Sequence, residues 1–228
     1  MDIDIFINIF PELLSGIGMT LTLFFSSISI GFVLAVGLFA LQIHDKAVIN
    51  RPARFVSYAI RGIPLLVQLY IVYYGLGQFE WLRSSVAWPL LREAFWCAIL
   101  TLSIVNCAFT AEIMRGAYQA VPKGLSEAGA ALGMPKYLIW WKIIIPNMGR
   151  IAIPSYGNEL ILMMKSTALA FTITLIDVMG VANHIRARTL LVVEPLLGAA
   201  LIYFIFALFI SRFNRSVERY LTPAYLRT

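Results

Sequence analysis

Charged residues are scarce in this sequence: they make up 13% of its 228 positions, whereas hydrophobic residues make up 60%. A typical soluble domain carries about 25% charged and roughly 45–50% apolar residues. The composition therefore excludes a disordered or collagen-like chain. A formal net charge of +6 would suit a nucleic-acid-binding domain, but the apolar excess excludes that class, and we expect no nucleic-acid partner. The composition indicates a polytopic membrane protein.

Residues that bind metals or form disulfides are also rare. The two cysteines, Cys97 and Cys107, lie in one apolar segment, and the only histidines are His44 and His184. These numbers exclude a disulfide framework and a metal site. We expect no cofactor in this chain.

Basic residues are missing from the beginning of the sequence, where none precedes Lys46. A cleavable signal peptide needs a basic leading region, so we expect none here. The first 14 residues, which include Asp2, Asp4 and Glu12, are instead typical of a short amphipathic segment lying on the membrane surface.

Long apolar runs are what the sequence has in abundance. Five are found: Leu13–Ile43, Gly62–Phe79, Ala94–Ala111, Ile151–Ile176 and Pro195–Ser211, of which only the fourth contains charges, Glu159 and Lys165. Their lengths suit helices that cross a hydrocarbon layer of roughly 30 Å, not barrel strands of about 10 residues. We therefore predict an all-α polytopic membrane protein, with five transmembrane helices in a single domain over residues 1–228.

The basic residues are distributed unequally between the predicted loops. Thirteen of the 18 fall on one side of the membrane: Lys46, Arg51, Arg54, Arg61, Arg115, Lys123, Lys136, Lys142, Arg150, Arg212, Arg215, Arg219 and Arg227. Because basic loops stay in the cytoplasm, this pattern predicts an outside N-terminus and a cytoplasmic C-terminus.

The longest predicted loop covers residues 116–150, between the third and fourth spans. Its pattern predicts a short helix over Leu125–Leu132, stopped by Gly133. Pro135 then opens a second helix, which we expect to end at Pro146. The second helix is the more apolar, which indicates that it lies in the membrane bundle while the first is presented to a partner.

Three motifs in this sequence resemble those of ABC importer permeases. Glu127-Ala128-Gly129, followed by Gly133 and Ile145-Pro146, resembles their EAA loop, with Gly129 in place of the second alanine and Ile145 in place of a leucine. The stretch RGIPLLVQ over residues 61–68 resembles the RGxPxxVQ motif of polar amino-acid permeases. Residues 158–169 are similar to their fourth span, especially in the arginine, histidine and octopine group. Together the motifs cover about two thirds of the chain.

The resemblance implies a permease subunit of MetI-like fold in a bacterial inner membrane, with a periplasmic N-terminus. Its implied partners are a second permease subunit, in a homo- or heterodimer, cytoplasmic ATP-binding subunits and a periplasmic solute-binding protein. The implied substrate is a polar, basic amino acid: arginine, histidine, lysine, ornithine or an opine-like derivative.

The resemblance also assigns residues 116–150 as the cytoplasmic loop that couples the permease to the ATPase. Within it, the small residues Ala128, Gly129 and Gly133 allow a close approach of the partner. Glu127 would fix the orientation of the short helix, by capping it or by pairing with a cation of the partner.

The chain itself lacks a nucleotide site. Lys165-Ser166-Thr167 is similar to the end of a phosphate-binding loop, but the glycines that must precede the lysine are missing. We therefore expect a transport subunit that is not an enzyme, with ATP hydrolysis in a partner.

Glu159 is the most informative single residue. It lies roughly 13 Å into the fourth span, near the bilayer centre, where a carboxylate is costly unless it is paired or hydrated. It could form a structural pair with Lys165 or with a neighbouring subunit, or it could be the counter-charge of a cationic substrate. The resemblance favours the second role.

Other polar residues could join Glu159. Asn158, Gln68 and Asn106 lie on separate predicted spans and could converge on a ligand or form interhelical hydrogen bonds. By its place in the matching motif, Thr167 is a candidate contact for a substrate carboxylate. Glu112 and Arg115 are spaced as an i,i+3 surface pair.

Two other functions remain to be weighed. A secondary transporter or channel for a small cationic solute is disfavoured by the absence of a charged ring, a glycine-rich filter or internal repeats. An intramembrane enzyme is disfavoured because Glu159 has no acidic or histidine partner within a span.

Overall fold

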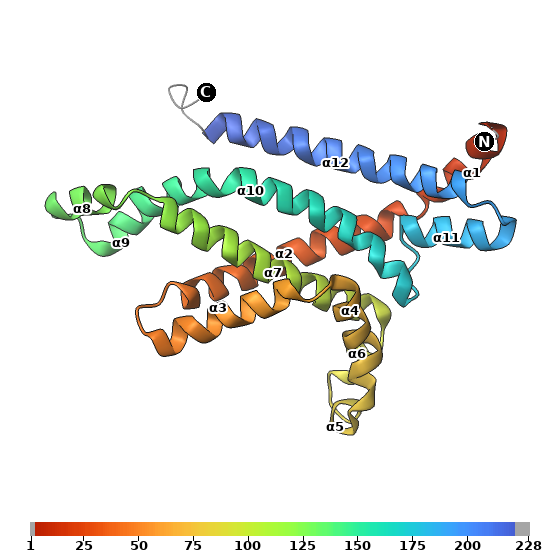
Figure 1. Cartoon of the computed structure of the whole chain (residues 1–228), viewed down its shortest axis with the longest axis horizontal. Coiled ribbons are helices and arrows are strands. Elements are labelled where there is room, and N and C mark those ends of the chain that lie inside the picture. The colour runs from red at the N-terminus through yellow and green to blue at the C-terminus, as the bar shows by residue number, and fades with distance from the viewer. Residues whose placement is uncertain (1–2, 222–228) are drawn as a thin grey trace.

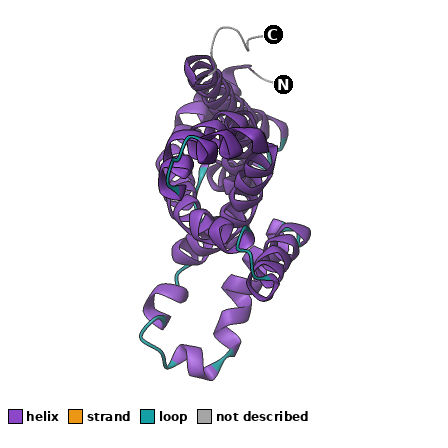
Figure 2. Cartoon of the chain, turned by 90° about the vertical axis from the view of Figure 1, so that its left-hand side faces the viewer, coloured by secondary structure: helices purple, strands orange, loops and turns teal. Residues whose placement is uncertain are grey.

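A computed structural model describes residues 3–221, and every regular element in that range is helical (Figures 1 and 2). The elements follow in this order: α1 Ile3–Leu14, α2 Ile17–Gln42, α3 Ala47–Gly62, α4 Leu65–Tyr70, η1 Ile71–Gly75, η2 Leu76–Gln78, α5 Glu80–Arg83, α6 Trp88–Leu91, α7 Ala94–Ala120, α8 Lys123–Ala131, α9 Lys136–Ile139, η3 Trp140–Ile144, α10 Ile145–Ser166, η4 Thr167–Ile173, α11 Val178–Thr189 and α12 Val193–Leu221. The predicted all-α class is confirmed.

Three stretches of helix are long and apolar enough to cross a membrane: Asn8–Gln42, Ala94–Ala120 and Val193–Leu221. Two bent helix pairs pass the same test jointly: Ala47–Gly62 with Leu65–Gln78, bent by 99°, and Lys136–Ile173 with Val178–Thr189, bent by 45°. By length and composition, the described chain therefore contains three spans, or up to five if each bent pair is one.

The long helices α2, α7, α10 and α12 run side by side along the length of the molecule (Figure 1). Helices α8 and α9 form one end of this bundle, and α1 and α11 lie at the other. Helices α4–α6 project from its side (Figure 2). The main core between the long helices includes Leu23, Leu69, Leu102 and Met163, each almost fully buried.

The second apolar run, Gly62–Phe79, does not form the single helix that its composition predicts. Pro64 follows Ile63, which is extended, and the chain turns sharply between α3 and α4. Proline has no N–H, so the carbonyl of Ile60 loses its helical donor. The side chain of Gln68 replaces it: its amide nitrogen donates to the carbonyls of Ile60 at 2.8 Å and Ile63 at 2.9 Å.

In the loop over residues 116–150, the first helix agrees with the prediction from the sequence, and the second differs from it. Helix α8 ends as predicted, with Gly133 in the left-handed conformation at φ +76°. The expected end at Pro146 is wrong, because α9, η3 and α10 form one continuous helical run. The wider π-helical turn of η3 ends at Ile144, directly before α10, and this local change in the hydrogen-bonding pattern lets the helical run continue through Pro146.

The N-terminal segment, predicted to lie on the membrane surface, forms helix α1, and Met1 and Asp2 lie outside the described residues. Rather than lying apart from the bundle, α1 buries Ile9 and Leu13 against α11 and α12. An ion pair of 2.7 Å between Glu12 and Arg188 adds a polar contact to α11.

Helices α10 and α12 approach closely at Gly157, where an added Cβ would overlap the side chain of Asn214. We expect Gly157→Ala to destabilise the protein by about 1–3 kcal/mol through overpacking. The matched control is Gly149→Ala in the same helix, where a Cβ meets nothing within 4 Å. Helix propensity predicts a neutral or stabilising effect there. Thermal unfolding of the purified variants checks this, and equal melting temperatures would contradict the close packing.

Candidate functional site

Glu159 faces a cavity of about 330 Å³ between α3, α4, α7 and α10, where Arg61, Gln68 and Phe109 also line the wall. Its side chain is buried, with 6% of the residue exposed. Within residues 3–221 its carboxylate makes no hydrogen bond or ion pair. The ion pair between Glu159 and Lys165, one of the two roles that the sequence suggests for Glu159, is therefore not formed, and Lys165 is exposed. The cavity thus contains a buried carboxylate whose hydrogen-bonding capacity is unused.

Arg61 brings the opposite charge to the same cavity from the last turn of α3. Its guanidinium lies over the ring of Phe109, 5.4 Å from the centroid, a geometry typical of a cation–π contact. One of its nitrogens is 3.8 Å from a carboxylate oxygen of Glu112 on α7. The sequence marks Arg61 as a basic residue of the cytoplasmic side and as the first residue of the RGxPxxVQ motif, but does not predict its place in the cavity.

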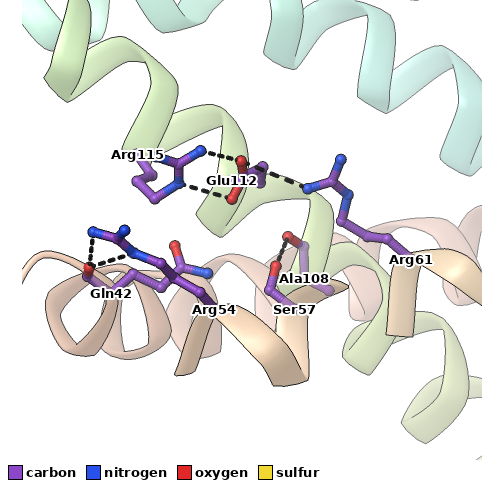
Figure 3. Close-up of polar contacts among 7 residues, drawn as sticks. All are labelled: Gln42, Arg54, Ser57, Arg61, Ala108, Glu112 and Arg115. Carbon is purple, nitrogen blue, oxygen red and sulfur yellow. Dashed lines mark hydrogen bonds and ion pairs between the residues drawn. The ribbon is translucent and has the colours of Figure 1, made fainter. Parts of the chain in front are cut away.

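The predicted pair of Glu112 and Arg115 is formed, but it is partly buried and not a surface pair. Arg115 donates to both carboxylate oxygens, with its Nε at 3.0 Å from one of them (Figure 3). Figure 3 shows Arg61 approaching the same carboxylate from the other side. Glu112 therefore joins the end of α3 to the C-terminal half of α7, with Arg115 as its stronger partner.

Two further contacts hold α3 against its neighbours (Figure 3). The hydroxyl of Ser57 donates to the carbonyl of Ala108 on α7 at 3.0 Å. Arg54 donates twice to the carbonyl of Gln42 at the end of α2, each time at 3.2 Å. Helix α3 is thus attached along its length, and Arg61 is its last attachment before the bend.

The other polar candidates do not converge with Glu159. Asn158 is exposed, and Asn106 is fully buried against Gly31 in the α2–α7 interface, without a hydrogen-bond partner in the described range. Thr167 is buried and donates to the carbonyl of Met164 at 2.7 Å. Of the four predicted substrate contacts, Glu159 and Gln68 line the cavity, whereas Asn158 and Thr167 do not.

A buried acid that lies outside the cavity, Asp177, is not among the residues predicted from the sequence. Asp177 is fully buried at the start of α11 and accepts hydrogen bonds from the backbone N–H of Gly180 and the hydroxyl of Tyr203, both at 2.8 Å. The hydroxyl of Tyr203 also contacts Thr20 and Thr167. An aspartate directly before a helix is a common N-cap, and this signal could have identified its role.

The proposed coupling residues lie on or directly after α8. Glu127 and Ala128 are exposed, and Glu127 makes no ion pair within the described chain. Gly129 is buried, and a Cβ there would lie 2.9 Å from the tip of Ile143 in η3. Gly129 thus permits the close packing of α8 on the following helix, while Glu127 is free to meet another protein.

Comparison with known proteins identifies the family. Residues 27–222 match the family described as binding-protein-dependent transport system inner membrane components. The chain belongs to this family. The resemblance inferred from the three motifs is therefore confirmed.

Curated relatives share both sequence and length with the chain. The octopine transport system permease protein OccM of Rhizobium meliloti is 44% identical, over 96% of this chain and 89% of the relative. The nopaline transport system permease protein NocM of Agrobacterium fabrum is 41% identical, over 98% and 93%. The histidine/lysine/arginine/ornithine transport system permease protein HisM of Salmonella typhimurium is 36% identical, over 91% and 89%.

Solved structures agree with the fold. A crystal structure of an amino acid ABC transporter with histidines superposes with a TM-score of 0.85, at 32% identity, over 96% of this chain and 98% of the other. The methionine ABC transporter MetNI superposes at 0.78 and 18% identity, over 95% and 99%, which shows the fold alone. The MetI-like permease fold and the expected function, a permease subunit of an ABC amino-acid importer, are confirmed. This finding favours the importer over both alternatives, the channel or secondary transporter and the intramembrane enzyme.

Proposed function

We propose that this permease imports amino acids with a cationic side chain and that Glu159 is the counter-charge of that cation. The observation that carries the proposal is the buried carboxylate of Glu159, which lines the cavity without a hydrogen bond or ion pair inside the described chain. A carboxylate buried at membrane depth is costly until a cation pairs with it. The names of OccM, NocM and HisM, which refer to opines and basic amino acids, support the same substrate class.

The size of the cavity fits a small solute. Its volume of about 330 Å³ lies at the lower end of the range of about 300–1,000 Å³ found for small-molecule sites. Gln68 would contribute its amide oxygen, since both of its recorded hydrogen bonds are made by the amide nitrogen. Asn158 and Thr167 stay predicted contacts that lie away from this cavity.

Five spans account best for the helices and for the charges between them. The proposed spans are α2, the apolar run Gly62–Phe79 that contains α4, and helices α7, α10 and α12, in a single transmembrane domain. The end that carries α8 is rich in basic residues and lies in the cytoplasm with the C-terminus, whereas the N-terminus is periplasmic. The protein is accordingly a multi-pass component of a bacterial inner membrane.

The assembly requires three kinds of partner. A second permease subunit completes the pathway, ATP-binding subunits supply the energy, and a periplasmic binding protein delivers the amino acid. We propose that residues 116–150 couple the chain to the ATP-binding subunits, with Glu127 pairing with a cation of the partner. Because α8 directly follows α7 and packs on the run that becomes α10, a movement of α8 would be transmitted to both helices as a rigid-body motion.

Purification and transport together test this function. A tagged chain is isolated from native membranes, its co-purifying subunits and bound amino acid are identified, and the complex is reconstituted in vesicles with its binding protein. We expect an ATPase to co-purify and arginine uptake to require ATP. Uptake without ATP, driven by an ion gradient, would instead support the secondary-transporter alternative.

A further inference from the structure

We propose that Arg61 binds the carboxylate of the transported amino acid, and that this binding weakens the contact of α3 with α7 because it competes with Glu112. The proposal rests on the proposed function. It adds a second residue that recognises the substrate, and a way in which binding in the cavity affects α7. It assigns the ligand class as molecules with both a free carboxylate and a cationic group.

The ion pair of Arg61 is poorly formed in the present structure. Its separation from Glu112 is 3.8 Å, compared with about 2.7–2.9 Å for a well-formed charge-assisted hydrogen bond. Arg115 already donates to both oxygens of Glu112. The five N–H donors of the Arg61 guanidinium make no hydrogen bond to any residue in the range 3–221.

The surroundings of Arg61 suit a carboxylate ligand. The ring of Phe109 lies against the guanidinium, and a stacked guanidinium still presents its N–H donors at its edge. A guanidinium fork binds a carboxylate with two parallel hydrogen bonds, which a long contact to Glu112 does not provide. Arg61 and Glu159 line one cavity with opposite charges, and a basic amino acid carries the two complementary groups.

The competing partner connects the cavity to the coupling helix. Glu112 lies on α7, which ends at Ala120, shortly before α8 begins at Lys123. When a substrate carboxylate takes Arg61, Glu112 keeps Arg115 and so remains neutralised. The bond from Ser57 to Ala108 and the stacking of Arg61 on Phe109 remain as well, so α3 would lose only its ionic contact with Glu112 and stay packed on α7. Binding of a substrate in the cavity would thus remove the ionic contact between α3 and α7.

The test compares arginine with agmatine, which has the same guanidinium but no carboxylate. Binding to the purified permease–ATPase complex is measured by calorimetry in the absence of the binding protein, whose selectivity would otherwise enter the result. We expect the wild-type complex to bind arginine at least tenfold more tightly than agmatine. Arg61→Gln should reduce this ratio to near one, and Arg61→Lys should restore it in part.

A neighbouring arginine provides the matched control. Arg54 lies on the same helix but donates to the carbonyl of Gln42 and does not line the cavity. Arg54→Gln should therefore keep the wild-type preference for arginine. In a second arm, Glu112→Gln removes the competing charge, and we expect arginine to bind about three- to tenfold more tightly.

The outcomes separate this inference from the proposed function. If neither compound binds the wild-type complex, the proposed function fails. If arginine binds and Arg61→Gln keeps the full preference over agmatine, the function stands and the role of Arg61 is overturned. An unchanged arginine affinity in Glu112→Gln would overturn the competition between ligand and Glu112.

Discussion

Replacing Glu159 with glutamine is expected to lower kcat/KM for arginine uptake by about 100-fold. Glutamine preserves the shape of the side chain but removes its charge, so a cation in the cavity loses a buried partner. The loss of one member of a buried charge pair costs about 2–5 kcal/mol, and about 100-fold corresponds to roughly 3 kcal/mol. The variant should be at least as stable as the wild type, because the buried carboxylate is unpaired without substrate.

Uptake of arginine and citrulline into vesicles measures this effect, since citrulline has nearly the same shape without the positive charge. With the same binding protein in both assays, the preference for arginine over citrulline should be far smaller in Glu159→Gln than in the wild type, while the ATPase still co-purifies. Glu93→Gln is the control, because Glu93 is an exposed residue paired with Arg92 outside the cavity. Wild-type arginine kinetics in Glu159→Gln would refute the counter-charge.

A leucine at Gly129 is expected to lower ATP-driven uptake tenfold or more, while the permease still binds arginine. Gly129 is where α8 packs on the following helix, and a Cβ there already lies 2.9 Å from the Cδ1 atom of Ile143. The larger side chain must push α8 away from η3, and overpacking of this kind costs about 1–3 kcal/mol. Glu159, the first residue of α10 that lines the cavity, lies 16 positions beyond Ile143, so the defect should affect coupling more than binding.

Gly129→Ala is the matched control for this variant. A single methyl group meets only the flexible ends of Ile143 and Ile139, and alanine favours the helix by up to about 1 kcal/mol. It also restores the second alanine of the family pattern. Uptake and the rate of ATP hydrolysis are measured on the same vesicles. Both should be near wild type in Gly129→Ala, whereas in Gly129→Leu less arginine should be taken up for each ATP hydrolysed. Tight coupling in the leucine variant would contradict the packing role.

Features that depend on a few neighbouring residues could be predicted from the sequence. Gly133 ends α8 because glycine adopts a left-handed conformation without strain. The long apolar runs predicted the main helices because a membrane leaves few alternatives. Glu159 could be singled out because an acid is costly in such a run.

Features that depend on contacts between distant segments could not be predicted. Asn158 and Glu159 are adjacent in sequence, yet one is exposed and the other buried, and an almost wholly apolar run does not reveal which side of the helix faces the bundle. The Arg61–Glu112 contact joins two residues that lie 51 positions apart in the sequence. The hydrogen bond from the Gln68 side chain to the carbonyl of Ile60 likewise depends on the turn of the chain between α3 and α4.

The most direct test of the account is a structure of the assembled transporter with arginine bound. We expect the amino acid in the cavity between α3, α4, α7 and α10, with its guanidinium at Glu159 and its carboxylate at Arg61. Arginine bound elsewhere in the permease, with this cavity empty or filled by lipid, would contradict it.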